Sequence, residues 1–296
     1  MSIADSLFGC IAATYPTHRM AQSKTLTAIW RCLYYALSPR KPFIMRTRGY
    51  RLYAHPLKGT LTRALVRRGG WEQTQTDVFC SLLRPGGLVI DAGANFGHYA
   101  LTAAGGVGAD GLVIAFEPHA ETFAMLEANC GLLADDNVRA VQAGLGTTDG
   151  IMDLHTDSEN PGGHSYYEWN LRGPSGQFHP VAVRSLDSYL SEVAPGRPVS
   201  VIKIDVQGFE TQVLMGATAV IARDRPAVFC EVTPGALRRA ESSVDEVLGF
   251  FRDRGYGAKV LIDGAGPPQA MDYPELLAFF AASGAEYHDI LFEVPA

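Results

Sequence analysis

The chain has 296 residues, of which 47% are hydrophobic and 19% are charged, and its formal net charge is −6. This composition excludes a disordered polypeptide, and the length suits one large α/β domain with an extension or two small domains. The five cysteines are scattered without a Cys-x-x-Cys pair, no apolar run approaches membrane-spanning length, and the N-terminus lacks a signal-peptide pattern. We therefore expect a cytoplasmic protein with reduced thiols.

The first 70 residues are strongly basic. They contain twelve Lys and Arg residues and one acid, a balance of +11, whereas the remainder has a balance of −17. Residues 1–37 are predicted to be helical, and the apolar stripe in 25–37 predicts an amphipathic helix that packs on the body, with weak contact to a membrane surface as the alternative. The acidic body argues against a nucleic-acid partner. We expect a basic extension at 1–44 and a main domain at 45–296, whose oligomeric state the sequence does not determine.

The segment before the first strong motif predicts three short elements. Residues 43–53 alternate enough for a hairpin around Arg48-Gly49, and 60–68 indicate a short helix that ends at Gly69-Gly70. Residues 72–83 have the pattern of a helix that ends before Pro85-Gly86-Gly87.

Residues 88–97 are the most informative stretch. An apolar run leads to Asp91, a turn containing Gly93 and Gly97, and an apolar helix start, which predicts a buried strand that enters a helix through a glycine-rich turn. A dinucleotide fingerprint has Gly-x-Gly-x-x-Gly and places pyrophosphate at the helix N-terminus, but here Asn95 takes the middle glycine position and an acid opens the turn. A carboxylate repels pyrophosphate and suits the ammonium of a bound amino acid, so the turn favours S-adenosylmethionine (SAM) over NAD.

A second buried strand, 112–116, ends at Glu117, which lies 26 residues after Asp91. An acid at this position accepts the ribose hydroxyls in dinucleotide folds, and SAM carries the same diol. A helix at 120–133 and a strand at 138–143 continue the alternation, which predicts a parallel sheet with helices on both faces.

The alternation is then interrupted by a polar and aromatic insertion. Short strands at 151–156 and 181–184 flank Asp157–Pro180, and segments of this length are usually functional lids or disordered. The insertion holds His164, a candidate base, and Tyr166, a candidate substrate contact. A surface histidine without a role, and aromatic residues that only fix the segment, are equally open interpretations; the other aromatic residues are Tyr167, Trp169 and Phe178.

After the insertion, the pattern predicts strands and helices in turn to the end of the chain: strand 199–204, helix 209–222, strand 227–231, helix 243–254, and strands 257–262 and 288–294. The first of these strands enters the second strong motif, Lys203–Glu210, which reads Lys-Ile-Asp-Val-Gln-Gly-Phe-Glu and precedes Gly216-Ala217. Strand 227–231 ends at Glu231.

These motifs occur in the order Asp91–Gly97, Phe116-Glu117-Pro118, Lys203–Glu210, Gly216-Ala217 and Glu231, and this combination resembles the FkbM family of SAM-dependent methyltransferases. Gly70-Trp71-Glu72 is also similar to the family's upstream Gly-aromatic-Glu signature. The resemblance covers roughly residues 45–295. Gln207 departs from it, because the family usually has Glu there, so we assign that position no essential charge.

The resemblance implies a Rossmann-like methyltransferase fold of seven mostly parallel strands, with one antiparallel strand supplied by a final hairpin. It also implies SAM as the cofactor and a hydroxyl of a sugar, polyketide or other secondary metabolite as the methyl acceptor. The expected cofactor contacts are Glu72, Asp91, Gly93, Asn95, Gly97, Glu117 and Pro118. The expected substrate contacts are Lys203, Glu210, Glu231 and Tyr166.

Methyl transfer to an alcohol requires in-line alignment and removal of the hydroxyl proton near the transition state. Asp205 is the first candidate base because it ends a strand beside the expected methyl group, although a buried acid paired with Lys203 for stability is the alternative. His164 is the second candidate catalytic residue. The remaining histidines that we consider are His98, which we expect at the cofactor carboxylate, His119 and His179.

Acids end four strands of the predicted sheet, and ligands bind at this edge in such folds. Their convergence requires a cation, which a sulfonium, an ammonium, Lys203 or a metal would supply. We expect no metal, with Mg²⁺ on Asp205 and Glu231 as the alternative. The four acids are Asp91, Glu117, Asp205 and Glu231.

Two other classes of function stay open. An NAD-dependent oxidoreductase would account for the sheet and Glu117, but not for Asp91 or for Lys203–Glu210. A non-catalytic binding protein on a decayed methyltransferase fold would not need intact acids at all four strand ends.

Overall fold

The structure is a computed structural model that describes residues 24–37, 43–47, 49–54, 72–157, 165–166, 175–262 and 266–295. The chain divides into two compact units, Met1–Gln73 and Thr74–Ala296, which are described separately. In the part of the chain that is described, no helix has the length and apolar character needed to cross a membrane.

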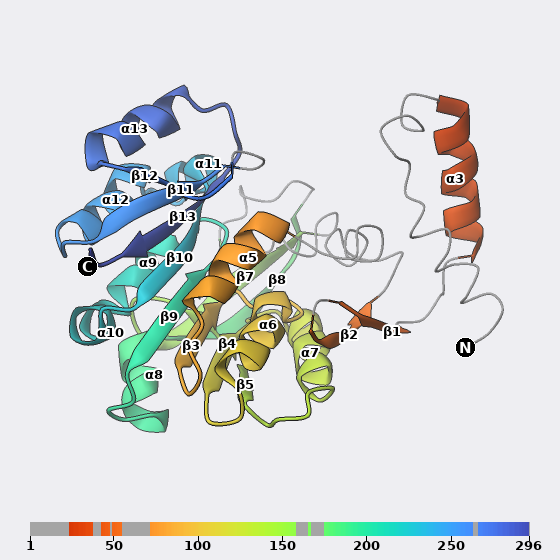
Figure 1. Ribbon diagram of the computed structural model, residues 1–296, viewed down its shortest axis with the longest axis horizontal. Coiled ribbons are helices and arrows are strands. Elements are labelled where there is room, and N and C mark those ends of the chain that lie inside the picture. Colours follow the sequence, from red (N-terminus) through yellow and green to blue (C-terminus); the bar gives the residue numbers. More distant parts are fainter. Residues whose placement is uncertain are drawn as a thin grey trace. The chain divides into compact units, whose positions relative to one another are not determined.

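The first unit contains helix α3 (Lys24–Leu37) and the antiparallel strands β1 (Phe43–Arg46) and β2 (Arg51–Ala54) (Figure 1). The helix and the hairpin that we expected are therefore present, and both lie in this unit. Three apolar side chains of α3, those of Leu26, Ile29 and Leu33, are about half exposed. The helices expected within 1–23 and 60–68 lie outside the described residues.

The second unit is built on an eight-stranded sheet with the order β12-β11-β13-β10-β9-β3-β4-β5 (Figure 1). Strands β5, β4, β3, β9 and β10 are parallel, β13 is antiparallel to both of its neighbours, and β12 is antiparallel to β11. The strands are β3 (Leu88–Ala92), β4 (Leu112–Phe116), β5 (Val138–Val141), β9 (Val199–Ile204), β10 (Ala227–Val232), β11 (Gly257–Leu261), β12 (Gln269–Met271) and β13 (His288–Glu293).

Helices cover both faces of this sheet. Alternate residues of each strand point to opposite faces, so each face packs its own apolar cluster against helices. In β3, for example, Leu88 and Ile90 belong to one apolar cluster and Val89 to the other. The first cluster includes side chains from α8 (Leu186–Val193), α9 (Glu210–Met215), α10 (Thr218–Asp224), α11 (Pro234–Arg239), α12 (Val244–Arg252) and α13 (Tyr273–Ala282). The second includes side chains from α5 (Gln73–Leu82), α6 (His98–Val107) and α7 (Ala120–Cys130).

The predicted mixed α/β fold with a mostly parallel sheet is confirmed, but its last strands are not a hairpin. Between β11 and β13 the chain forms β12 and α13, and β13 then enters the sheet between β10 and β11. The expected helix 209–222 is also interrupted at Gly216 and Ala217, which separate α9 from α10. Periodicity identified seven strands of this eight-stranded sheet and missed the short edge strand β12. The lateral order of the strands depends on contacts between residues that are far apart in the sequence.

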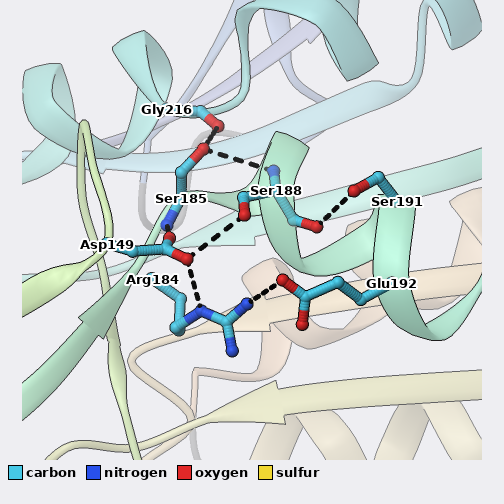
Figure 2. A network of polar contacts seen from close by, with 7 residues as sticks. All are labelled: Asp149, Arg184, Ser185, Ser188, Ser191, Glu192 and Gly216. Atoms are coloured by element: carbon cyan, nitrogen blue, oxygen red, sulfur yellow. Dashed lines mark hydrogen bonds and ion pairs between the residues drawn. The ribbon is translucent and has the colours of Figure 1, made fainter.

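A second, three-stranded sheet carries the base of the insertion. It has the order β6-β8-β7, with β6 (Gly144–Leu145), β7 (Gly150–Asp157) and β8 (Ser175–Arg184). Figure 2 shows how Asp149 joins this sheet to α8: its carboxylate accepts hydrogen bonds from Ser185 N at 2.7 Å, Arg184 Nε at 3.0 Å and Ser188 Oγ at 3.2 Å. Ser185 caps α8 and donates from Oγ to Gly216 O at 2.9 Å.

The same junction depends on a close approach of two backbone segments. A Cβ atom at Gly216 would lie 1.9 Å from Gly146 O, so only glycine fits without movement of the backbone. The junction between β6 and the turn from α9 to α10 therefore allows no larger residue at position 216.

We predict that Gly216→Ala lowers the free energy of unfolding by roughly 3 kcal/mol, because overpacking against a backbone oxygen forces the chain to shift. Urea denaturation monitored by circular dichroism measures the effect. Gly150→Ala is the matched control, because a Cβ atom there meets nothing within 4 Å. Equal stabilities of the two variants would contradict the prediction.

Candidate active site

A cleft lies at the carboxyl ends of β3, β4 and β9. Ligands bind at this edge in open α/β sheets. Its wall comes from the main sheet, from β6 and β7 and from the insertion. The lining residues are Gly93, Asn95, Glu117, Pro118, Gly144, Leu145, Leu154, Tyr166, Asp205, Val206 and Gln207.

The floor of the cleft is the turn between β3 and α6. Gly93 has φ +80°, and a Cβ atom there would lie 1.9 Å from Asp205 O, so the turn packs directly on the backbone of the second motif. Asn95 has a left-handed φ of 53° and accepts a hydrogen bond from Phe96 N on its own Oδ1 at 2.9 Å. Asparagine tolerates this conformation better than most residues, which explains how it replaces the middle glycine.

Asp91 is a deeply buried carboxylate. It is the next-to-last residue of β3, it is 1% exposed, and neither carboxylate oxygen has a hydrogen-bond partner among the described residues. Burial raises its pKa to about 6, although the nearby Lys203 ammonium opposes this change. An unsatisfied buried carboxylate is costly, so a cationic or hydrogen-bonding ligand would stabilise it.

Glu117 lies beside this turn in the wall of the cleft. Its Oε2 accepts a hydrogen bond from Asn95 N at 3.0 Å and its Oε1 accepts one from His119 N at 2.9 Å. Burial raises the pKa of Glu117 to about 7, and the two backbone hydrogen bonds act in the opposite direction. Each carboxylate oxygen has a second lone pair, so the fixed carboxylate retains acceptor capacity.

Lys203 and Asp205 form a partly buried ion pair next to this turn. Lys203 lies beside Asp91 in the register of β3 and β9, its Nζ is 3.2 Å from Asp205 Oδ2, and it sits 4.6 Å from the centre of the Tyr99 ring. Gln207 donates from Nε2 to Asp205 Oδ1 at 3.0 Å and to Glu231 Oε1 at 3.1 Å. Both oxygens of Asp205 are therefore held by donors, which fixes the orientation of its carboxylate.

The insertion reaches the cleft through Ser165 and Tyr166. Ser165 forms an isolated antiparallel bridge with His155 of β7, and its Oγ donates to Gln207 O at 3.3 Å. The Tyr166 ring packs on Phe209 with centroids 4.5 Å apart, while its buried hydroxyl has no hydrogen-bond partner among the described residues. Burial, together with the nearby Glu117 carboxylate, raises the Tyr166 pKa above its usual range, so this group is a neutral donor.

Several of the predicted site residues lie away from the cleft wall. Glu210 is buried in the first turn of α9 and accepts a hydrogen bond from Gly208 N at 2.9 Å, so it closes the turn of the second motif instead of lining the cleft. Glu231 accepts a hydrogen bond from Gln207 Nε2 and is not one of the lining residues. Gly97 immediately precedes α6 and has a left-handed backbone conformation. Glu72, with φ 42°, immediately precedes α5.

The histidine candidates are dispersed. His98 is buried with its Nε2 3.0 Å from Thr76 Oγ1, and burial lowers its pKa to about 4, so its ring is neutral near pH 7. The ring of His119 contacts Thr122, and His179 lies at an exposed position of β8. His164 lies outside the described residues, as do Tyr167 and Trp169, and Phe178 is 62% exposed.

Sequence reasoning missed the contribution of the small sheet. Gly144, Leu145 and Leu154 line the cleft, but each is an ordinary residue in a weak strand pattern and carries no chemical signal. Gln207 was noticed only as a departure from a motif, and its bridge between two carboxylates requires the register of β9 and β10. Within the described residues, no group of three or more His, Cys, Asp or Glu side chains has a metal-binding arrangement.

These features define a class of protein: a Rossmann-like α/β fold with a glycine-containing turn and carboxylates at the strand ends. The family model described as Methyltransferase FkbM domain matches residues 91–257, and the chain belongs to this family. Methyltransferase 1 of Beauveria bassiana (strain ARSEF 2860) is 31% identical over 144 residues, which are 44% of this chain and 57% of that protein. The chain thus spans little more than half of this relative's length.

Solved structures give weaker similarity. A methyltransferase FkbM from Methylobacillus flagellatus KT is 13% identical, with coverage of 97% of this chain and 58% of that chain and a TM-score of 0.40. A SAM-dependent O-methyltransferase from Thermotoga maritima is 13% identical, with coverage of 89% and 82% and a TM-score of 0.42. Similarities of this size carry no argument about the site, which depends on the residues described above.

We predict that Asp91 makes the protein less stable as the pH rises. Its folded-state pKa of about 6 lies above the unfolded value of 3.8, so its stabilising contribution is present below pH 3.8 and is lost as the pH rises through about 6. Between pH 4 and pH 8, the free energy of unfolding of the original chain should therefore fall further than that of Asp91→Asn. The difference between the two decreases should be on the order of 3 kcal/mol.

Urea denaturation at several pH values measures this difference. Asp153→Asn, at an exposed position of β7, is the control for removal of one carboxylate. Parallel pH profiles for Asp91→Asn and the original chain would contradict the prediction.

Proposed function

We propose that the protein is a SAM-dependent methyltransferase that methylates a hydroxyl oxygen of a small molecule. The observation that carries the proposal is Asp91, a fully buried carboxylate without a hydrogen-bond partner among the described residues, directly below the glycine turn. The ammonium of the methionine part of SAM would supply the missing donors and the missing positive charge.

The rest of the cleft fits the same cofactor. Glu117 has lone pairs free for the ribose hydroxyls, and Pro118 and Asn95 lie beside it in the cleft wall. SAM carries a sulfonium in addition to its ammonium, so it suits a cleft that is lined by Glu117 and Asp205 and has Asp91 buried next to its glycine turn. The pyrophosphate of NAD would add negative charge at the same place.

When bound, SAM supplies an electrophilic methyl group on sulfur. The chain then has to align the acceptor oxygen, exclude water and accept the hydroxyl proton. Asp205 is our candidate for this base, because Lys203 and Gln207 hold its carboxylate at the cleft wall. His164 is the second candidate, and its role stays a prediction from the sequence.

A small acceptor agrees with the mixed character of the wall. Leu145, Leu154 and Val206 provide apolar surface, whereas Glu117, Asp205 and Gln207 provide polar groups. A sugar, a polyketide or another secondary metabolite with a free hydroxyl has both kinds of surface. Tyr166, Lys203 and Glu231 are the residues that we propose for binding or positioning it.

We predict that SAM at about 100 times its Kd raises the melting temperature by about 5 °C, since binding then adds about 2.7 kcal/mol of stability. NAD at the same concentration should have no effect. Stabilisation by NAD alone would favour an oxidoreductase, and no response to either compound would favour a non-catalytic protein.

Glu117→Ala should raise the SAM Kd at least tenfold in calorimetry, because hydrogen bonds to a charged group are lost.

Two further variants make the calorimetric test specific. Glu117→Gln keeps the side-chain size and one acceptor oxygen, so its Kd should lie between those of the original chain and Glu117→Ala. Glu127→Ala removes an exposed carboxylate from α7 and should bind SAM normally. An unchanged Kd in Glu117→Ala would remove the ribose assignment.

For Asp205→Asn we predict that methyl-acceptor turnover falls by about 10²–10⁴ while the SAM Kd changes by less than about threefold, because general-base catalysis is lost but cofactor contacts remain. The measurement is formation of S-adenosylhomocysteine with an acceptor found by screening hydroxylated small molecules. His164→Ala is tested in parallel. Full turnover in Asp205→Asn together with a large loss in His164→Ala would transfer the base to His164.

A further inference from the structure

Gln207 occupies an unusual place between two carboxylates. Its Nε2 atom is 3.0 Å from Asp205 Oδ1 and 3.1 Å from Glu231 Oε1, and these two acids end neighbouring parallel strands. A side-chain amide has two N–H donors, so one nitrogen satisfies both carboxylates at once. The opposite orientation of the amide would direct its oxygen at two carboxylates, so the network determines the assignment.

The backbone holds the amide in this place. Gln207 has a left-handed φ of 52°, which is uncommon for a residue with a long side chain. Its carbonyl oxygen accepts a hydrogen bond from Ser165 Oγ at 3.3 Å, and the next residue, Gly208, donates its N–H to the buried Glu210 carboxylate. The turn is therefore fixed from both sides, which directs the Gln207 side chain toward the two acids.

A carboxylate at position 207 would create a different site. Three carboxylates would converge on one point, while the neighbouring Lys203 ammonium is already paired with Asp205 Oδ2. Like charges at hydrogen-bond distance require a proton or a cation between them. Three hard oxygen donors from three side chains form a plausible ligand set for Mg²⁺ or Ca²⁺.

We propose that Gln207 is a positioning residue that takes the place of a divalent cation between Asp205 and Glu231. Its two amide N–H groups donate hydrogen bonds to the carboxylates that a cation would otherwise bridge. They leave Asp205 oriented toward the cleft. The role of Asp205 in catalysis rests on the proposed function. On that basis, the acceptor binds through hydrogen bonds from its hydroxyl groups, and not through a vicinal diol that chelates a metal.

The test is a gain of cation binding. Calorimetric titration of MgCl₂ and CaCl₂ into the full chain, without SAM or acceptor, compares the original protein with Gln207→Glu. The variant should bind one ion with a Kd of about 0.1–1 mM, a range found for weak protein calcium sites, and the original chain should bind at least tenfold more weakly. Gln269→Glu adds the same charge at an exposed position of β12 and should behave like the original chain.

The double variant Gln207→Glu with Glu231→Gln is the matched control. It exchanges the amide and the carboxylate, so it restores two carboxylates and one amide and should lose the cation binding gained by Gln207→Glu. If Gln207→Glu needs Mg²⁺ to fold, the same gain appears as a Mg²⁺-dependent melting temperature.

Three results would overturn the proposal: equal cation affinity in the original chain and Gln207→Glu, binding retained in the double variant, or a Gln207→Glu chain that binds no ion. If Gln207→Glu remains unfolded in the presence of Mg²⁺ while the double variant folds, the single variant is taken to bind no ion, which overturns the proposal. Because the titration contains no SAM, its outcome is independent of the melting-temperature test of the proposed function.

Discussion

The site depends on how negative charge is accommodated at the carboxyl edge of a buried parallel sheet. Lys203 lies on β9 beside Asp91 of β3, and its ammonium pairs with Asp205 at 3.2 Å. A buried ammonium between two acids compensates part of their charge, but Asp91 still has no hydrogen-bond donor among the described residues. Asp91 is therefore a buried acid whose charge is only partly compensated, and burial raises its pKa for the same reason.

The two motifs that form the site use the same backbone device. Each turn has a non-glycine residue in the left-handed region, Asn95 in the first and Gln207 in the second, and each places a polar side chain where a hydrogen bond fixes it. The turns also touch one another, because the missing Cβ of Gly93 leaves room for Asp205 O. Such strained positions persist only where the surrounding structure determines them, and here they position the carboxylates of the cleft.

The insertion and its small sheet complete the cleft from outside the main fold. Hydrogen bonds to the Asp149 carboxylate connect the end of β8 to the start of α8. The absence of a side chain at Gly216 lets the turn between α9 and α10 pack directly on the backbone after β6. Leu154 of β7 and Tyr166 of the insertion line the cleft together with Gly93 and Asn95 of the first turn. The cleft therefore takes part of its lining from a sheet separate from the one that carries the two motifs.

The sequence by itself determined the parallel sheet, the glycine turn and the acids at the strand ends, because these follow from local periodicity and from short motifs within single elements. It also predicted Asp91, Glu117 and Asp205 as members of one site. Tertiary structure alone decided that the buried Glu210 carboxylate accepts a hydrogen bond from Gly208 N and that Gln207 donates hydrogen bonds to both Asp205 and Glu231. It also decided that β13 lies between β10 and β11. Each of these depends on strand register and side-chain direction, which are set by contacts between residues that are far apart in the chain.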